Sequence, residues 1–481
     1  MGIRRLKMRT EKDYRNRLYS YRRNIFIKGE KVGRDHPSFQ PGINAIAENF
    51  HLALDPKSQD LFTTISHLTG NKVNRFNSPP RSIEDLLKKI ECVRTLAQHL
   101  GGCALRCGGM DTLSGISVVT REVDEELGTD YHPRFLKFLQ HMQDDDLVTS
   151  ILITDPKGDR SLRPYQQADP DMYLRILEKK SDGIVVNGAK LFGETTVQDE
   201  ITVAPTRAMT DKDGAYAVSF SVPADYDGVT ILCKPVQAPM RKKIKAPYAE
   251  YGYPGITITV FDKAFIPWER VWLCGEWKHA GRMSSLVALY HRTSYCGCKA
   301  AVTDLILGTA ALVAEYNGLE KEKHIREKLA HLAATAEQVY ACGVSGAVKA
   351  KASSSGTYIP DPIYINAGRY HAGMNIYHEY ETLSDISAGQ GINLPTEEDF
   401  LTPELDRFTK KYIKRKADVS AENIWRLFRL VDEMIYSEQA GFWQAAGLHG
   451  GGSPVMERLT ILANYDMDAK KRLVKRLAGI H

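Results

Sequence analysis

The chain has no run of about 18 uncharged apolar residues, the length that a membrane-spanning helix needs. Its basic N-terminus lacks the apolar segment of a secretory signal, and the residues after Gly2 do not complete a myristoylation motif. An excess of one charge is also lacking, because 64 basic residues face 59 acidic ones. This balance argues against nucleic acid or a membrane surface as a partner. We therefore expect a soluble, cytoplasmic protein.

Cysteine is scarce: eight residues in a chain of 481 do not make a disulfide scaffold. Cys296 lies two residues from Cys298, so on a helix it points elsewhere, and we predict that it is a bystander. Four isolated cysteines are predicted to be small buried side chains: Cys92, Cys233, Cys274 and Cys342. The other three cysteines belong to two motifs.

The first motif, His-Arg-Thr-Ser-Tyr-Cys-Gly-Cys-Lys, runs from His291 to Lys299. It lies near the start of a long alanine- and leucine-rich segment that is predicted to be helical. On such a helix His291, Tyr295 and Cys298 share one face, because their offsets are 0, 4 and 7. Lys299 lies one turn beyond Tyr295. A stripe of imidazole, phenol, thiol and amine is not typical of a hydrophobic core and predicts a functional surface.

The second motif lies far upstream and contains Cys103 and Cys107, four residues apart, so that both thiols point the same way on a helix. Three cysteines and one histidine form a four-ligand set for a soft metal centre. The helix rises about 10 Å between His291 and Cys298, whereas a single zinc ion needs every donor at roughly 2.0–2.3 Å. The spacing favours an iron–sulfur cube, with zinc as the alternative.

Three segments of different character follow one another along the chain. Residues 1–145 and 281–481 carry apolar residues at helical spacing, whereas residues 146–280 contain short β-branched or alternating runs separated by glycine, aspartate and proline. This order predicts an N-terminal α-helical domain, a β-domain and a C-terminal helical bundle. The two cysteines of the second motif then belong to the first domain, and His291 and Cys298 belong to the last.

Several polar loops are candidates for cofactor binding. The loop Thr154–Arg160 follows an apolar strand and can present backbone amides and cations to a phosphate or a flavin ring; a surface turn is the alternative. The basic cluster Arg241–Lys245 is either a solvated loop or a contact for a phosphate-rich ligand such as coenzyme A. Two glycine-rich loops, Ser387–Gly391 and His449–Pro454, lie at predicted helix ends.

Together these motifs resemble the 4-hydroxybutyryl-CoA dehydratases, which belong to the flavin family of the 4-hydroxyphenylacetate hydroxylases. The similarity covers nearly the whole chain, and the Cys-x3-Cys and His-x6-Cys pattern separates the iron–sulfur dehydratases from the hydroxylases. The resemblance implies an α+β, acyl-CoA dehydrogenase-like fold in which the middle domain is a β-barrel. It also implies a homotetramer.

The resemblance further implies two cofactors. A 4Fe–4S cluster would be held by Cys103, Cys107, His291 and Cys298. FAD would lie against the β-domain, near Thr154, Lys157, Gly158, Asp159, Arg160, Gln167 and Lys190. A neighbouring subunit would help to bind FAD through Ala388, Gly389 and Gln390.

The activity that the resemblance implies is the radical dehydration of a 4-hydroxyacyl-CoA thioester, such as 4-hydroxybutyryl-CoA, with vinylacetyl-CoA isomerisation as a second activity. FAD would take and return one electron, and an iron would act as Lewis acid on the leaving hydroxyl. His291 would be both iron ligand and proton acceptor, while Tyr295, Lys299 and Glu457 match catalytic positions. An oxygen-sensitive enzyme of anaerobic metabolism is expected. The alternatives are a two-component flavin monooxygenase acting on phenols and a zinc-stabilised helical assembly protein.

Two positions depart from the dehydratase pattern. After Lys190 the chain reads Leu-Phe-Gly-Glu-Thr-Thr, where the dehydratases carry a Gln-Thr-Gly run. They also carry a catalytic carboxylate close to the position of Ile256, and this chain has none there. We therefore predict either that Glu194 supplies a relocated acid or that the substrate differs.

Overall fold

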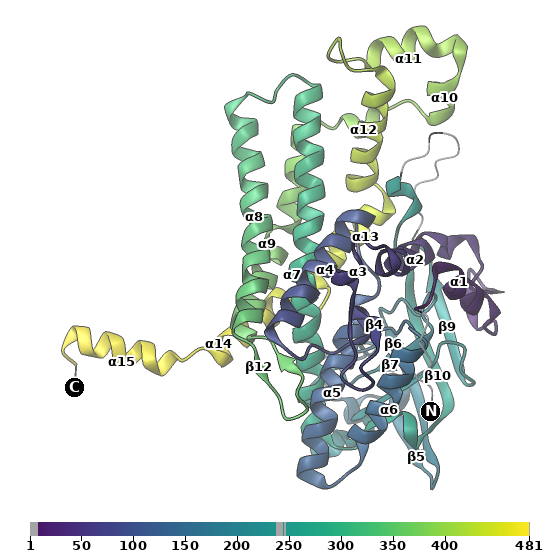
Figure 1. The fold of residues 1–481 in the computed structure, drawn as a ribbon, viewed down its shortest axis with the longest axis vertical. Coiled ribbons are helices and arrows are strands. Elements are labelled where there is room, and N and C mark those ends of the chain that lie inside the picture. The colour runs from purple at the N-terminus through teal and green to yellow at the C-terminus, as the bar shows by residue number, and fades with distance from the viewer. Residues whose placement is uncertain (1–7, 237–243, 245–246, 481) are drawn as a thin grey trace.

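The structure is a computed structural model that describes residues 8–236, 244 and 247–480. Sheets and helices from the first half of the chain lie beside a tall helical bundle, and the C-terminus extends from the bundle as a separate arm (Figure 1). Gly2 and most of the basic cluster Arg241–Lys245 lie outside the described residues, so the expectation of a coenzyme A contact there is not addressed by the structure.

The N-terminal part is mainly helical. Helix α4 (Ile83–Leu100) begins where the Ser82 side chain accepts a hydrogen bond from the Asp85 backbone amide, and it ends at Gly101 in the left-handed conformation. Helix α5 (Cys107–Leu127) is buried over most of its length and packs against α6 and the long C-terminal helix α7. The other helices of this part are α1 (Glu11–Ser20), α2 (Gln40–Leu54), α3 (Gln59–Phe62) and α6 (Tyr131–Asp144).

The middle of the chain forms two open sheets, so the expected β-barrel and the acyl-CoA dehydrogenase-like arrangement built on it are wrong. The larger sheet has the strand order β2-β1-β9-β10-β6-β5 and the smaller one β11-β8-β7. Among the described residues, nothing pairs the outer strands β2 and β5 with each other. Both carry exposed charged residues, including Lys31 and Lys179, and charged edges of this kind prevent further strand pairing.

The strands of the larger sheet come from distant parts of the chain. Strand β1 pairs in parallel with β9, placing Ile25 opposite Ile231, while β10 lies antiparallel between β9 and β6. The bounds of this sheet are β1 (Ile25–Ile27), β2 (Glu30–Val32), β5 (Arg175–Lys179), β6 (Gly183–Leu191), β9 (Val229–Lys234) and β10 (Ile256–Pro267). The remaining strands are β3 (Thr63–Ile65), β4 (Lys72–Asn74), β7 (Glu200–Val203), β8 (Val218–Pro223), β11 (Val271–Cys274), β12 (Lys351–Ala352) and β13 (Tyr358–Ile359).

Helix α7 (Trp277–Tyr316) is the central element of the C-terminal half and packs against α4, α5, α8 and α9. Within the described part of the chain, it is the one helix long and apolar enough to cross a membrane, but 56% of its apolar window is buried inside the fold. Such burial is characteristic of a core helix. The other helices are α8 (Lys323–Val348), α9 (Pro362–Ile386), α10 (Glu397–Leu401), α11 (Asp406–Ile413), α12 (Ala421–Ile435), α13 (Glu438–His449), α14 (Pro454–Asn464) and α15 (Met467–Ala478).

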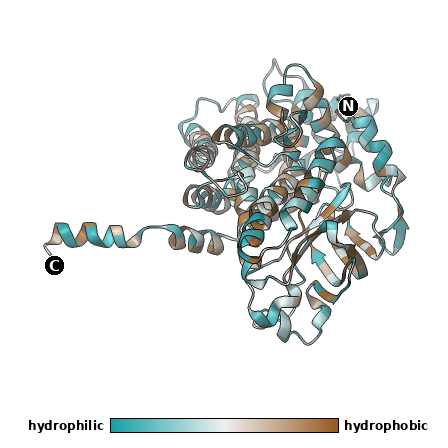
Figure 2. Cartoon of the chain, turned by 60° about the horizontal axis from the view of Figure 1, so that its bottom comes forward, coloured by the Kyte–Doolittle hydropathy of each residue, from teal (hydrophilic) through white to brown (hydrophobic). Residues whose placement is uncertain are grey.

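Helix α14 packs against α9, and the C-terminal arm formed by α15 leaves the body of the molecule (Figures 1 and 2). Helix α15 has no buried residue, and the apolar side chains of Leu473, Val474 and Leu477 are all exposed. Apolar residues alternate with charged ones along this helix (Figure 2). Within the described part of the single chain, no other segment covers these apolar side chains of α15.

Candidate metal and catalytic site

Helix α7 presents the first motif to α4 and α5. Gly297 permits the close approach of α4, because a Cβ at this position would lie 2.4 Å from the Ile90 carbonyl oxygen. Gly115 of α5 meets α7 in the same way, since its Cβ would lie 2.6 Å from a methyl group of Val287. Small residues at both crossings therefore let backbones from distant parts of the sequence bring their functional side chains together.

Replacing Gly297 by alanine is expected to destabilise the fold by about 1–3 kcal/mol, the usual cost of overpacking a core. The added methyl group must push α7 away from α4, because the nearest atom is backbone. Gly308→Ala is the control, since that position of α7 has nothing within 4 Å and alanine favours a helix by about 0.5–1 kcal/mol. Thermal unfolding of both variants measures the difference; a melting temperature of Gly297→Ala equal to or above that of Gly308→Ala would show that the crossing tolerates the methyl group.

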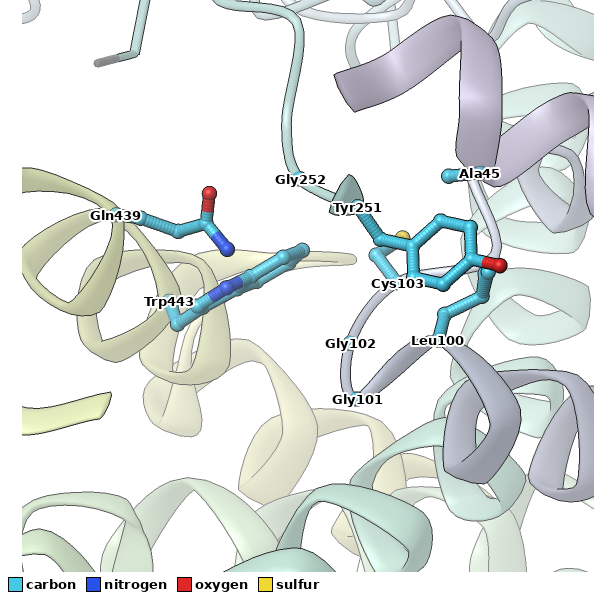
Figure 3. A pocket seen from close by; sticks show the side chains of 9 residues that line it. All are labelled: Ala45, Leu100, Gly101, Gly102, Cys103, Tyr251, Gly252, Gln439 and Trp443. Carbon is cyan, nitrogen blue, oxygen red and sulfur yellow. The ribbon is translucent and has the colours of Figure 1, made fainter. Parts of the chain in front are cut away.

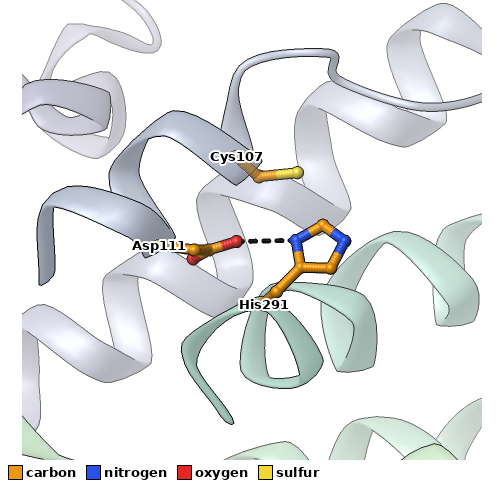
Figure 4. Close-up of side chains that lie close together, drawn as sticks. All are labelled: Cys107, Asp111 and His291. Carbon is orange, nitrogen blue, oxygen red and sulfur yellow. Dashed lines mark hydrogen bonds and ion pairs between the residues drawn. The ribbon is translucent and has the colours of Figure 1, made fainter. Parts of the chain in front are cut away.

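The structure brings the four predicted metal ligands into one region. The Cys107 thiol at the start of α5 and a ring nitrogen of His291 lie within 4.8 Å of one another, together with the Asp111 carboxylate (Figure 4). Cys103, in the loop before α5, raises the pKa of the Cys107 thiol, and burial raises that pKa as well. Burial raises the pKa of the Cys298 thiol, and the charge of Cys103 raises it further. Three thiols and one imidazole thus converge from α7 and from the loop–helix segment of α5.

The donor spacing suits a cluster better than a single ion. Tetrahedral zinc ligands lie roughly 3.3–3.8 Å from one another, given bonds of about 2.0–2.3 Å. Among the described residues, the compact donor group includes neither Cys103 nor Cys298, so these sulfurs stand further from at least one of its members. Thiolate-rich donor sets hold iron–sulfur clusters. The residues present therefore fit a sulfur-bridged cluster.

Asp111 is a buried carboxylate that the sequence analysis missed. It lies one helical turn after Cys107, and its side chain contacts His291, Lys89 and Ser294. Burial alone would raise the pKa of Asp111, but the Lys89 ammonium and the His291 hydrogen bond lower it below its ordinary value. Its position at i+4 from a cysteine was the available signal.

Glu194 lies in the loop after β6 and interacts electrostatically with His291. Its carboxylate accepts a hydrogen bond from the Tyr253 hydroxyl. Burial raises the pKa of Glu194, and the Tyr253 hydrogen bond and the His291 charge partly oppose that rise. The pKa of Tyr253 is raised mainly by burial, with contributions from Glu194, Cys103 and Cys107. Glu194 therefore interacts electrostatically with His291, and Tyr253 interacts with both Glu194 and the two cysteines of the second motif.

A small pocket lies beside Cys103 (Figure 3). Glycines form part of its wall, and a Cβ at Gly252 would lie 2.5 Å from the Gln439 Oε1 atom. Within the described structure, Gln439 Oε1 and Trp443 Nε1 are buried without a hydrogen-bond partner. The lining residues are Ala45, Leu100, Gly101, Gly102, Cys103, Tyr251, Gly252, Gln439 and Trp443. The pocket beside Cys103 therefore contains one unpaired hydrogen-bond acceptor, Gln439 Oε1, and one unpaired donor, Trp443 Nε1, among the described residues.

Tyr295 and Glu457 lie around one arginine. The Tyr295 hydroxyl donates to the Gly447 carbonyl oxygen at 2.6 Å, and the Arg369 guanidinium lies 4.1 Å from the centre of the tyrosine ring. Glu457 is fully buried, with Arg369 Nε 3.5 Å from its Oε1 atom. Burial raises the pKa of Glu457, while Arg369 and Arg292 oppose the rise. Two of the predicted catalytic residues, Tyr295 and Glu457, thus lie around Arg369, a neighbour that the sequence did not reveal.

Lys299 is 2% exposed and donates to Glu379, a fully buried carboxylate on α9. It also donates to the Thr303 hydroxyl at 2.6 Å. Glu379 is a second buried carboxylate that the sequence did not reveal. Lys299 therefore sits in a buried ion pair between two helices of the bundle.

The loop expected to contact FAD is ordered by its own residues. The Gln167 amide accepts from the Asp159 backbone N–H and donates to the Asp159 carbonyl oxygen, both at 2.9 Å. Gly158 has a φ of +52°, and a Cβ there would lie 2.3 Å from Gln167 Oε1. This packing explains the glycine in the motif. The same loop contains Thr154, whose carbonyl accepts from the Leu191 amide at 2.7 Å, as well as Lys157 and Arg160.

Lys190 and the segment from Ala388 to Gln390, which were also expected to contact FAD, make their hydrogen bonds within the protein. The Lys190 ammonium donates to the carbonyl oxygens of Ile153 and Ala204 and pairs with Asp155 at 2.8 Å, so protein acceptors surround it. Gln390 accepts from Arg415 at 2.7 Å. Ala388 and Gly389 have positive φ values and follow the C-terminal end of α9. In one chain this segment packs on α12 and belongs to the bundle.

The family models for the N-terminal and C-terminal parts of 4-hydroxyphenylacetate 3-hydroxylase match residues 10–273 and 280–479. The chain therefore belongs to the 4-hydroxyphenylacetate 3-hydroxylase family. Within this family it is 35% identical to the 4-hydroxybutyryl-CoA dehydratase/vinylacetyl-CoA-Delta-isomerase of Clostridium aminobutyricum, over 98% of this chain and 99% of that protein. The resemblance to the dehydratases is thereby confirmed.

Three further matches describe the relationship. The oxygenase component of 4-hydroxyphenylacetate 3-monooxygenase from Thermus thermophilus is 25% identical, over 97% of this chain and 96% of that protein. The solved structure of an oxygen-tolerant archaeal 4-hydroxybutyryl-CoA dehydratase from N. maritimus matches with a TM-score of 0.94 and 34% identity, covering 99% of this chain and 96% of that one. A solved structure of the monooxygenase component with FAD shares the fold, with a TM-score of 0.87 at 23% identity and 98% coverage of both chains.

Proposed function

We propose that this protein is a 4-hydroxyacyl-CoA dehydratase that uses FAD and a 4Fe–4S cluster and converts 4-hydroxybutyryl-CoA, or a close analogue, to crotonyl-CoA. The observation that carries the proposal is the convergence of Cys103, Cys107, His291 and Cys298 in a chain that matches a dehydratase over nearly its full length. The same site supports isomerisation of vinylacetyl-CoA, because that reaction also moves a proton along the acyl chain.

The bound cofactors would supply one-electron redox chemistry and a Lewis acid for the leaving hydroxyl. The chain supplies the proton chemistry. An α-proton of the thioester can be removed because the carbonyl stabilises the resulting enolate. The imidazole of His291 is the candidate acceptor, on the condition that Nε2 is not bound to iron when it takes the proton. Glu194, whose pKa is raised by burial, is the candidate acid. Tyr295 and Glu457 are candidates for positioning the thioester and for the second proton transfer.

Glu194→Gln is expected to lower kcat by about 10²–10⁴-fold, the usual contribution of a positioned acid. The acid form exists below the raised pKa of Glu194, so wild-type activity should fall as pH rises through that value. Tyr253→Phe keeps the ring contact with Phe442 but removes a hydrogen bond that lowers this pKa, so its basic limb should move to higher pH. A pH–rate profile of each variant is the measurement. An unchanged limb in Tyr253→Phe would contradict the assignment.

Glu194→Gln is expected to be less active than the wild type but to become more stable relative to it as pH rises. For a carboxyl group whose folded-state pKa is raised above 4.5, the stabilising contribution is complete below 4.5 and is lost as pH rises through the folded value. The glutamine variant does not undergo this loss. Its melting temperature should therefore gain on that of the wild type across this window, as thermal scans at several pH values can measure.

We also propose that FAD lies against the β-domain at the loop ordered by Gln167. The ion pair between Lys190 and Asp155 would stabilise this loop. The segment of Ala388, Gly389 and Gln390 would approach FAD from a neighbouring subunit of a homotetramer. The exposed apolar stripe of α15 supports an assembly of several chains. The division at residues 1–145, 146–280 and 281–481, the cytoplasmic location and a role in anaerobic metabolism are part of the same proposal.

The proposed function is tested with anaerobically purified protein and a panel of 4- and 5-hydroxyacyl-CoA esters. We expect crotonyl-CoA from 4-hydroxybutyryl-CoA, bound flavin and about four irons per chain. Turnover of the free hydroxy acid without coenzyme A would overturn the thioester assignment. Hydroxylation of a phenol by iron-free protein with reduced flavin would favour the monooxygenase instead.

A further inference from the structure

Three side chains from two helices, α4 and α7, meet at the carboxylate of Asp111, which is fully buried on α5. Lys89 of α4 donates to Oδ1 at 2.6 Å, and Ser294 of α7 donates to the same oxygen at 2.8 Å. The Nδ1 atom of His291, also on α7, lies 2.9 Å from Oδ2. The Lys89 ammonium is itself 1% exposed and lies 5.1 Å from the centre of the Tyr290 ring. The carboxylate is therefore held from several sides.

This arrangement determines which nitrogen of His291 carries the proton. A carboxylate paired with a buried ammonium only accepts hydrogen bonds, so the bond to His291 requires a hydrogen on Nδ1. A neutral imidazole has one N–H, which leaves the lone pair on Nε2. That nitrogen lies on the side of the ring away from Asp111 (Figure 4). Nε2 is thus the atom available to a metal.

The ring of His291 is also restricted on its flank. Gly451, with a φ of +77°, packs there so closely that its Cβ would lie 3.2 Å from the histidine Cδ2 atom. The loop that contains Gly451 is the glycine-rich segment His449–Pro454. A side chain at this position would press on the imidazole. The hydrogen bond and the glycine together fix the orientation of the ring.

We propose that Asp111, neutralised by Lys89, is a positioning residue that fixes His291 as the Nδ1–H tautomer and directs Nε2 at an iron of the cluster. The inference rests on the proposed function, because it assumes that His291 is a ligand. One turn of α5 then supplies both a ligand thiolate, Cys107, and the carboxylate that orients the ligand from α7. Outer-shell carboxylates of this kind typically change metal affinity or activity by about 10–100-fold.

The test is Asp111→Asn in protein grown with ¹⁵N-labelled histidine, with pulsed EPR of the reduced cluster as the readout. In Asp111→Asn the Oδ1 atom still accepts from Lys89 and Ser294, so an N–H₂ group faces His291 and favours the wrong tautomer. We expect a histidine nitrogen coupling in the wild type, its loss in Asp111→Asn, and a fall in kcat/KM of about 10–100-fold. Ser294→Ala is the matched control, since it removes one donor but leaves the carboxylate, and it should retain the coupling.

A second variant distinguishes loss of the histidine coupling from loss of the fold. Asp111→Asn leaves the Lys89 ammonium buried without an anion, whereas Asp111→Leu combined with Lys89→Met removes both charges and keeps the volume. This double variant should fold and bind flavin but lack the histidine coupling. A coupling that persists in either folded variant would overturn the role of Asp111. A wild type that contains iron but shows no histidine coupling would instead overturn the ligand set of the proposed function.

Discussion

Cys298→Ala is expected to lose cluster iron and to reduce dehydratase activity by more than about 100-fold, because even outer-shell changes cost 10–100-fold. Cys298 lies on the face of α7 that interacts electrostatically with Cys103, and burial keeps its thiol neutral in the absence of a cation. A bound metal deprotonates such a thiol and uses it as a ligand. Iron and flavin content per chain, with turnover of 4-hydroxybutyryl-CoA, measure the effect.

Cys296→Ala is the matched control, because it makes the same chemical change two residues away. The Cys296 sulfur faces α9, where a Cβ at Gly368 would lie 3.3 Å from it, and the residue is fully buried. This variant should lose about 1 kcal/mol of stability through a small cavity but retain its iron. Equal iron loss in both variants would point to general misfolding. Full iron in Cys298→Ala would remove that residue from the ligand set.

The helical part of the fold was accessible from sequence because its signals are local. Ser82 followed by acidic residues marks the start of α4, and glycine marks its end, as the structure shows. The strand pairing in the sheets could not be predicted in this way, because it joins distant parts of the chain. Strand β1 joins β9 more than 200 residues later, and nothing in the local pattern of Ile25–Ile27 specifies that pairing. Short alternating runs identify strands but not their neighbours. They predicted a β-domain, the resemblance supplied the closed barrel, and the observed strand pairing gives two open sheets instead.

The candidate site shows the same division. Spacing along one helix was enough to place His291, Tyr295 and Cys298 on a common face of α7. The partners were missed because a lone charged residue in a helix is usually solvated. Asp111 and Glu379 are buried by contacts with distant helices, and burial of that kind cannot be read from periodicity. Sequence therefore revealed the chemically unusual residues, and tertiary packing revealed the charges that position them.

Lys299→Met is expected to destabilise the protein by about 3–5 kcal/mol, whatever its effect on catalysis. Lys299 and Glu379 are 2% and 0% exposed, so removing the ammonium leaves a buried carboxylate without its countercharge. A second carboxylate oxygen, Glu379 Oε1, already lacks a hydrogen-bond partner among the described residues. Urea denaturation would measure the loss, and activity measured on this variant alone would confuse instability with chemistry.

Combining Lys299→Met with Glu379→Met separates the two roles. Replacing both members of a buried ion pair by apolar side chains of similar volume is often neutral or stabilising by about 1–4 kcal/mol, so the double variant should recover the stability that the single variant loses. If Lys299 acts on the substrate, the recovered protein will still have a low kcat. Wild-type turnover in a stable double variant would show that the ion pair only joins α7 to α9, because the lysine would then be dispensable once its buried partner is gone.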